Sequence, residues 1–174
     1  MPRSGFKLVV KIQDKVERTK RLMTLARASR GSYAVVGVTD ASETYPGTTV
    51  TVGQVAAWNE FGEGRVPSRS FLRTPVDDMQ PLINRKREQL LENMIAGEVS
   101  VAAALEALGF LVSNGIKNAI IRGIGPPLKP KTIERKREQR ASKGPSPTPE
   151  TPLMDTGLLI SKIGYEVYLA GGGE

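Results

Sequence analysis

The spacing of apolar and polar residues predicts a chain of strands and helices in which two helices dominate the middle. Residues 6–12 are rich in apolar and β-branched side chains that partly alternate, which favours a first strand. Helical spacing follows and ends at Gly31. Residues 33–39 are typical of a well-buried strand, and residues 162–169 alternate like a final strand. We expect these last two segments to pair.

The clearest amphipathic helix is predicted over residues 99–121, where apolar side chains recur at intervals of three and four. Gly115 lies inside this segment, and we expect it to mark a close helix contact. A preceding helix is predicted from near Asp77 or Asp78 to about Ala96, because acidic residues suit a helix start. The pattern indicates an α+β fold: a small mixed or antiparallel sheet packed by two long helices, with extended loops or arms.

Two shorter helices are also predicted. Thr51 and Gln54 have the spacing of a capping box, which would start a helix that ends at Phe61. Gly62 follows at the position where a left-handed cap is favoured. A short, highly charged helix is expected over residues 132–140.

The composition fits a single α+β domain over residues 1–174, with 39% hydrophobic and 25% charged residues. The net charge of +7 is uneven. A basic N-terminal strand and helix over residues 1–30 and a basic stretch over residues 129–143 flank a nearly neutral body. We expect a proline-rich mobile arm over residues 141–152 and a flexible tail over residues 170–174.

The residue types bound the possible chemistry. The chain contains neither cysteine nor histidine, so disulfides are excluded and the commonest general base and metal ligand are missing. No apolar run is long enough to cross a bilayer, and the N-terminus lacks the apolar core of a secretion signal. We expect a cytosolic product that is not an enzyme and has no cofactor or membrane partner.

Two motifs invite a catalytic or metal-binding interpretation. Asp155-Thr156-Gly157 resembles the loop of a dimeric aspartic protease, but Leu158 follows the glycine and helices dominate the chain. We therefore expect Asp155 to cap the last helix. Glu60 and Glu63 flank Gly62, but two carboxylates alone are weak evidence for a divalent cation site.

Several short motifs occur in a fixed order between about Val35 and Val167. Their residues are Trp58, Asn59, Glu60, Phe61, Gly62, Pro67, Arg69, Phe71, Leu72, Arg73, Pro127, Leu128, Thr132, Lys136, Asp155, Thr156 and Gly157. In this order the motifs resemble the small neck and tail-completion proteins of tailed bacteriophages, the family around the minor tail component of a lambdoid phage.

This resemblance implies a non-catalytic virion component at the head–tail junction, made in the host cytoplasm. Copies would form a closed ring, hexameric or dodecameric, that joins tail to head and lets DNA pass through its lumen. The expected partners are head-completion or connector proteins and tail-tube or terminator proteins. The alternative is a nucleic-acid-binding accessory protein that uses the two basic segments.

The resemblance also assigns structural roles to single residues. Phe61 is expected to plug the core, and Phe71 and Leu72 to anchor their segment against the sheet. Arg69 and Arg73 are four residues apart, so they could share a helical face and meet a carboxylate within the body or between subunits. For the single tryptophan, Trp58, both a core position and an interface position remain open.

Overall fold

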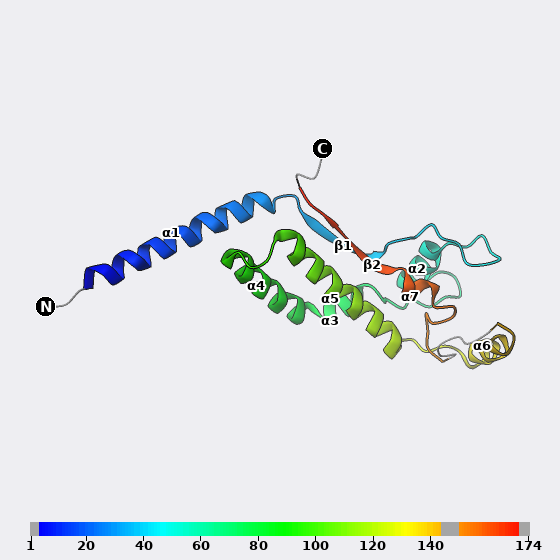
Figure 1. Cartoon of the computed structure of the whole chain (residues 1–174). Coiled ribbons are helices and arrows are strands. Elements are labelled where there is room, and N and C mark those ends of the chain that lie inside the picture. Colours follow the sequence, from blue (N-terminus) through cyan, green and yellow to red (C-terminus); the bar gives the residue numbers. More distant parts are fainter. Residues whose placement is uncertain (1–3, 144–149, 171–174) are drawn as a thin grey trace.

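A computed structural model describes the backbone of residues 4–143 and 150–170, and the side chains of residues 14–138 and 150–170. Its sheet has two antiparallel strands, β1 (Tyr33–Val38) and β2 (Ile163–Tyr168). One long helix, α5 (Val101–Arg122), packs across this pair (Figure 1). The α+β class and the pairing of the two segments are therefore confirmed.

The two faces of the sheet differ in burial. Tyr33 pairs with Tyr168, and their rings stack with centroids 5.0 Å apart on the outer face. Val35 lies on the same face and is 50% exposed. The inner face carries Val36 and the fully buried Ile163. The prediction that residues 33–39 form a well-buried strand is wrong for this outer face, because α5 covers only one face of the pair.

The predicted long helix before α5 is divided in two. A short helix, α3 (Arg73–Asp78), is followed directly by α4 (Gln80–Ala96), and Met79 is the cap residue between them. Helical structure thus begins at Arg73, earlier than the predicted start near Asp77 or Asp78. Gly115 makes the expected close contact, since a Cβ there would overlap the Met79 side chain. Gly109 makes a second one that the spacing did not indicate: its Cβ would lie 2.5 Å from the Tyr165 ring.

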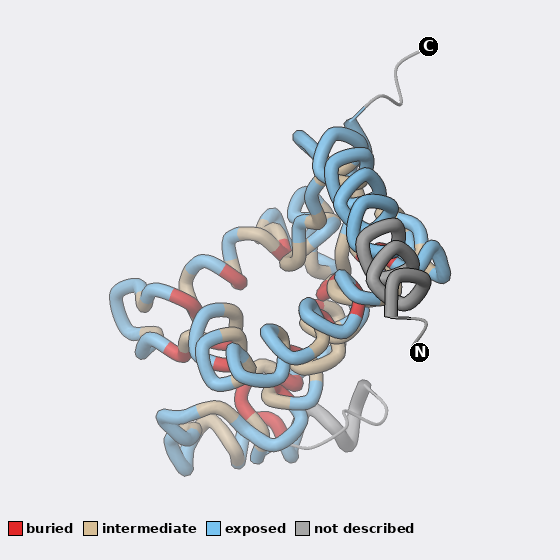
Figure 2. Tube along the Cα trace, turned by 90° about the vertical axis from the view of Figure 1, so that its left-hand side faces the viewer, coloured by how far each residue is buried: buried red, intermediate tan, exposed pale blue. Residues whose placement is uncertain are grey.

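The core lies where α5, the inner sheet face and α2 (Val52–Phe61) meet. Figure 2 shows buried positions on the inward sides of the helices and exposed positions around them. The largest fully buried side chains are those of Phe71, Ile116, Ile120, Ile163 and Val52. The core is built mostly from aliphatic side chains that pack around Phe71.

The N-terminal segment is a single helix, α1 (Ser4–Ala28). The predicted strand over residues 6–12 is wrong. A strand needs a neighbour to satisfy its backbone groups, whereas a helix satisfies them internally, and this segment continues into a helix. α1 extends away from the sheet (Figure 1), and every described side chain on it is exposed or half-buried.

Two arginines attach α1 to α4. Arg18 Nη2 donates to both carboxylate oxygens of Glu92, at 2.7 and 3.0 Å. Arg21 donates to the backbone oxygen of Ala96 at 3.2 Å. This oxygen lies at the C-terminal end of α4, where a cation is favoured by the helix dipole.

The capping box at the start of α2 is confirmed. The Gln54 amide donates to Thr51 Oγ1 at 3.1 Å, and the Thr51 amide donates to Gln54 Oε1 at 2.9 Å. Gly62 ends the helix with a φ of 84° and a ψ of 141°, so its φ is positive but the expected left-handed helical cap is not formed. Its missing Cβ leaves space for the Ser68 backbone nitrogen.

The remaining elements are α6 (Pro130–Lys143) and α7 (Leu158–Ser161). α6 is longer than the predicted helix at both ends. Of the predicted arm, residues 144–149 lie outside the described part, residues 141–143 complete α6, and Pro152 is buried. Residues 171–174 of the predicted tail also lie outside it. Among the helices that the structure describes, none has the length and apolar character needed to span a membrane.

Candidate functional site

The residues that carry the resemblance gather around α2 and the loops that face it. α2 supplies residues 58–61, and the following loop and α3 supply residues 67–73. α6 and the segment before α7 approach from the other end of the chain. Two polar contact networks hold these pieces together.

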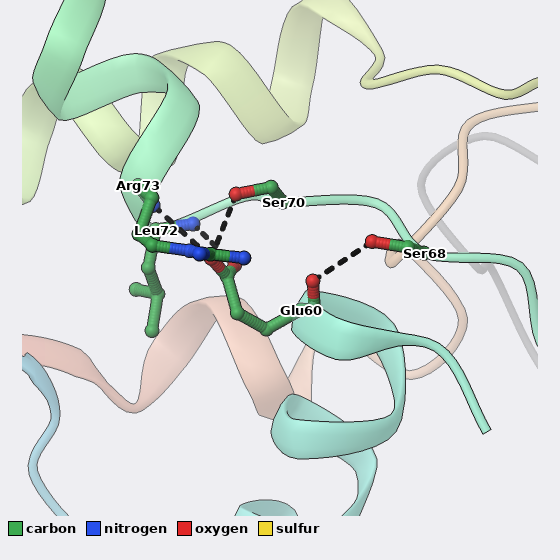
Figure 3. A network of polar contacts seen from close by, with 5 residues as sticks. All are labelled: Glu60, Ser68, Ser70, Leu72 and Arg73. Carbon is green, nitrogen blue, oxygen red and sulfur yellow. Dashed lines mark hydrogen bonds and ion pairs between the residues drawn. The ribbon is translucent and has the colours of Figure 1, made fainter.

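The first network is centred on Glu60, whose side chain is only 4% exposed (Figure 3). Its carboxylate accepts hydrogen bonds from Ser70 Oγ at 2.7 Å, from the Leu72 amide at 2.9 Å and from Arg73 Nε at 2.9 Å. Its backbone oxygen accepts from Ser68 Oγ at 2.9 Å. The end of α2 is thereby fixed to the start of α3.

The environment of Glu60 favours its ionised form. Burial raises the pKa of this carboxyl, but the Leu72 amide, the Ser70 hydroxyl and Arg73 together outweigh burial and hold the pKa below its ordinary value. With its oxygens already engaged by these donors, Glu60 is poorly placed to bind a cation with Glu63. No group of three or more acidic side chains among the described residues could hold a metal ion.

Phe61 does not plug the core as expected. Its side chain is 68% exposed, and the Arg73 guanidinium lies 5.2 Å from the ring centroid. Phe71, which is fully buried, takes the core position instead. The reason is geometric: α2 buries Glu60 in its network, and the next residue then points outward. Trp58 is half-buried, and Pro67 is exposed.

Arg69 and Arg73 do not share a helical face, because α3 begins only at Arg73. Arg69 lies in the preceding loop and is 6% exposed. Its backbone amide donates to the Asn59 oxygen at 2.5 Å, and its Nε donates to the Pro126 oxygen at 2.8 Å. The side chain of Arg73 therefore pairs with the Glu60 carboxylate, whereas the side chain of Arg69 donates to the backbone oxygen of Pro126.

The second network is centred on Lys136 of α6, which is 9% exposed. Its Nζ donates to the backbone oxygens of Thr151 and Met154 at 3.4 and 3.3 Å, and lies 3.8 Å from the Asp155 carboxylate. Burial lowers the pKa of Lys136, and the Asp155 carboxylate opposes this shift. This lysine holds α6 against the segment that leads into α7.

Asp155 does not cap α7, which corrects the sequence-based expectation. Gly157 is the residue at the cap position, with a φ of 78°, and the Leu158 amide donates to Thr156 Oγ1 at 3.2 Å. The carboxylate of Asp155 is turned to Lys136 instead. The two intervening residues displace Asp155 from the first turn of the helix.

Beside the second network lies a pocket of about 390 Å³. Arg69 and Lys136 supply buried cations to its lining, and Asp155 supplies a carboxylate. The rest of the lining is mostly apolar. The apolar and aromatic members include Tyr45, Val50, Val55, Leu128, Leu153 and Leu158.

The pocket unites seven of the residues that carry the resemblance. These are Asn59, Arg69, Leu128, Lys136, Asp155, Thr156 and Gly157. Phe71, Leu72 and Arg73 serve the core and the Glu60 network, while Pro127 is exposed and Thr132 is half-buried in the first turn of α6. Tyr45 and Val50 were missed because they come from a turn-rich loop with no distinguishing pattern.

No family model matches this chain, and neither the comparison with curated proteins nor the comparison with solved structures found a match.

Proposed function

We propose that this chain is a structural component of a tailed-bacteriophage virion at the head–tail junction. In this role, copies form a closed ring that contacts a head-completion or connector protein on one side and a tail protein on the other. The chemistry of such a role is attachment between proteins. The motif resemblance over residues 35–167 suggests this role.

The observation that carries the proposal is the amount of large apolar surface left uncovered on several elements. Phe61, Phe110 and Met23 are 68%, 61% and 58% exposed. They lie on α2, α5 and α1, so large apolar side chains are exposed on three different helices. Exposed side chains of this kind are available to pack in the apolar centres of interfaces with neighbouring subunits.

Two further features support assembly. α1 projects from the body and carries the exposed apolar side chains of Val16, Leu22 and Met23. The sheet has only two strands in the described chain, and each therefore has an edge without a partner strand. Open edges and projecting helices are common points of contact between subunits.

Replacement of an exposed apolar side chain tests the proposal. Phe110→Ser should leave the fold intact, because the side chain is exposed, but should reduce ring formation by the purified chain. Analytical ultracentrifugation and negative-stain microscopy would measure the ring population. Lys86→Ser, a change at a polar position of α4, is the matched control. A wild-type chain that stays monomeric with and without candidate neck proteins would contradict the proposal.

The alternative, a nucleic-acid-binding accessory protein, is favoured by the basic residues on α1 and α6. Against it, Arg18 and Arg21 are engaged with α4, and Lys136 is buried. DNA retention that weakens steeply with salt, in a chain that forms no rings, would favour this alternative.

A further inference from the structure

The pocket beside α2 contains a buried arginine, Arg69, that has no counter-charge among the described residues. Among the described side chains, no carboxylate lies within ion-pair distance of Arg69. The only side-chain hydrogen bond it makes there is from Nε to the Pro126 oxygen. Burial lowers the pKa of this guanidinium.

The free end of the guanidinium is accessible from the pocket. Neither Nη atom of Arg69 has an acceptor among the described residues, yet no fully buried side-chain nitrogen lacks a partner. Both Nη atoms are therefore reached by solvent, and Arg69 lines the pocket. Two parallel N–H groups of this kind match the two oxygens of a carboxylate.

The charges of the pocket favour a single negative group. Lys136 is already partnered by Asp155 at 3.8 Å and by two backbone oxygens. The pocket residues Arg69, Lys136 and Asp155 together carry one excess positive charge. The walls formed by Val50, Val55, Leu128, Leu153 and Leu158 are apolar. A carboxylate attached to an apolar group satisfies both properties.

We propose that this pocket binds the side chain of an aspartate or glutamate flanked by apolar residues on a neighbouring protein chain. The inference rests on the proposed function, because a virion subunit meets such neighbours. Arg69 receives the carboxylate through its two Nη atoms, and the apolar walls receive the flanking side chains. The sequence suggested that Arg69 and Arg73 could meet carboxylates; Arg73 meets one within the chain, and Arg69 meets one from outside.

A matched pair of peptides tests the inference with the full chain. Acetyl-Leu-Glu-Leu-amide and acetyl-Leu-Gln-Leu-amide differ only in the charge of the central side chain. Titration would be followed by NMR at the Arg69 Nε–H and at the methyl groups of Val55 and Leu128. The acidic peptide should bind at least about tenfold more tightly than the amide peptide, a difference typical of one charge-assisted contact.

Variants and competitors complete the test. Arg69→Gln should lower the affinity for the acidic peptide at least about tenfold, whereas Arg65→Gln, which removes the same charge from an exposed turn, should not. If Arg69→Gln unfolds, the comparison of the two peptides on the wild-type chain still shows whether the pocket prefers a carboxylate. Equal binding of both peptides, or no binding at about 10 mM, would overturn the proposal.

The source of the carboxylate is decided by two further probes. Tighter binding of inorganic phosphate than of the acidic peptide would overturn the assignment to a carboxylate. Tighter binding of sodium hexanoate than of the acidic peptide would show that the pocket binds a small carboxylate and not a protein side chain, and would overturn the proposal. Rings that form while the peptide fails to bind would refute only the pocket assignment. Peptide binding by a chain that never assembles would refute only the proposed function.

Discussion

The Nε atom of Arg73 lies 2.9 Å from a carboxylate oxygen of Glu60, and this pair joins the first residue of α3 to the last turn of α2. The glutamate is buried and the arginine is 65% exposed. The pair is therefore asymmetric: solvent can replace Glu60 as a partner of Arg73, but it cannot replace Arg73 and the other donors as partners of Glu60.

Removal of the Glu60 charge should destabilise the fold. In Glu60→Gln, the amide oxygen can accept only part of the present hydrogen bonds, and the amide NH₂ faces donors. We expect a loss of about 2–3 kcal/mol in the free energy of unfolding, measured by urea denaturation. Glu63→Gln, an exposed change three residues away, should alter stability by less than about 0.5 kcal/mol. Equal effects of the two changes would show that the network does not stabilise the fold.

The stabilisation by Glu60 should depend on pH. Its pKa is lower in the folded chain than in the unfolded chain, so folding favours the ionised form. The contribution is then fully present above the ordinary glutamate pKa of about 4.3 and disappears as the pH falls through the lower folded pKa. The difference in unfolding free energy between wild type and Glu60→Gln should therefore shrink in this acidic range. A difference that stays constant down to about pH 3 would contradict this assignment.

Gly109 should not tolerate a side chain. A Cβ there would lie 2.5 Å from the Tyr165 ring, on the face where α5 packs against β2. Although alanine favours helix by about 1 kcal/mol, overpacking should dominate, and we expect Gly109→Ala to cost about 1–3 kcal/mol. Gly37→Ala is the control, because a Cβ at that strand position meets no atom within 4 Å. Thermal unfolding of both variants measures the effect, and a stabilised Gly109→Ala would refute the close packing.

Lys136 should hold the segment before α7 in place. Lys136→Met keeps an apolar stem of similar length but removes the donors to the Thr151 and Met154 oxygens. We expect faster amide hydrogen exchange over residues 151–158 and a loss of about 1–2 kcal/mol in stability. Lys129→Met, an exposed change just before α6, is the control. Unchanged exchange in Lys136→Met would show that α6 is not what orders this segment.

Local signals in the sequence predicted much of the fold. The capping box of Thr51 and Gln54 depends on residues three apart, and the amphipathic helix depends on spacings of three and four, so both were correctly predicted. The pairing of β1 with β2 followed from their patterns. The strand predicted over residues 6–12 was wrong because a short apolar run does not distinguish a strand from part of a long helix.

The candidate site was harder to predict because it depends on contacts between distant segments. Nothing local distinguishes Phe61, which is exposed, from Phe71, which is buried. The spacing of Arg69 and Arg73 suggested a common helix, but the helix boundary falls between them. Asp155 has the residue type of a cap, yet its partner is Lys136. These assignments follow only from the way distant segments of the chain meet around α2.

The most direct test of the central claim is a cryo-electron microscopy reconstruction of particles from a phage whose genome encodes this chain. The account predicts density for this fold in a closed ring between the portal and the tail tube, with the pocket of Arg69 facing a neighbouring chain. Mature particles that lack the chain, together with a catalytic turnover by the purified protein, would contradict it.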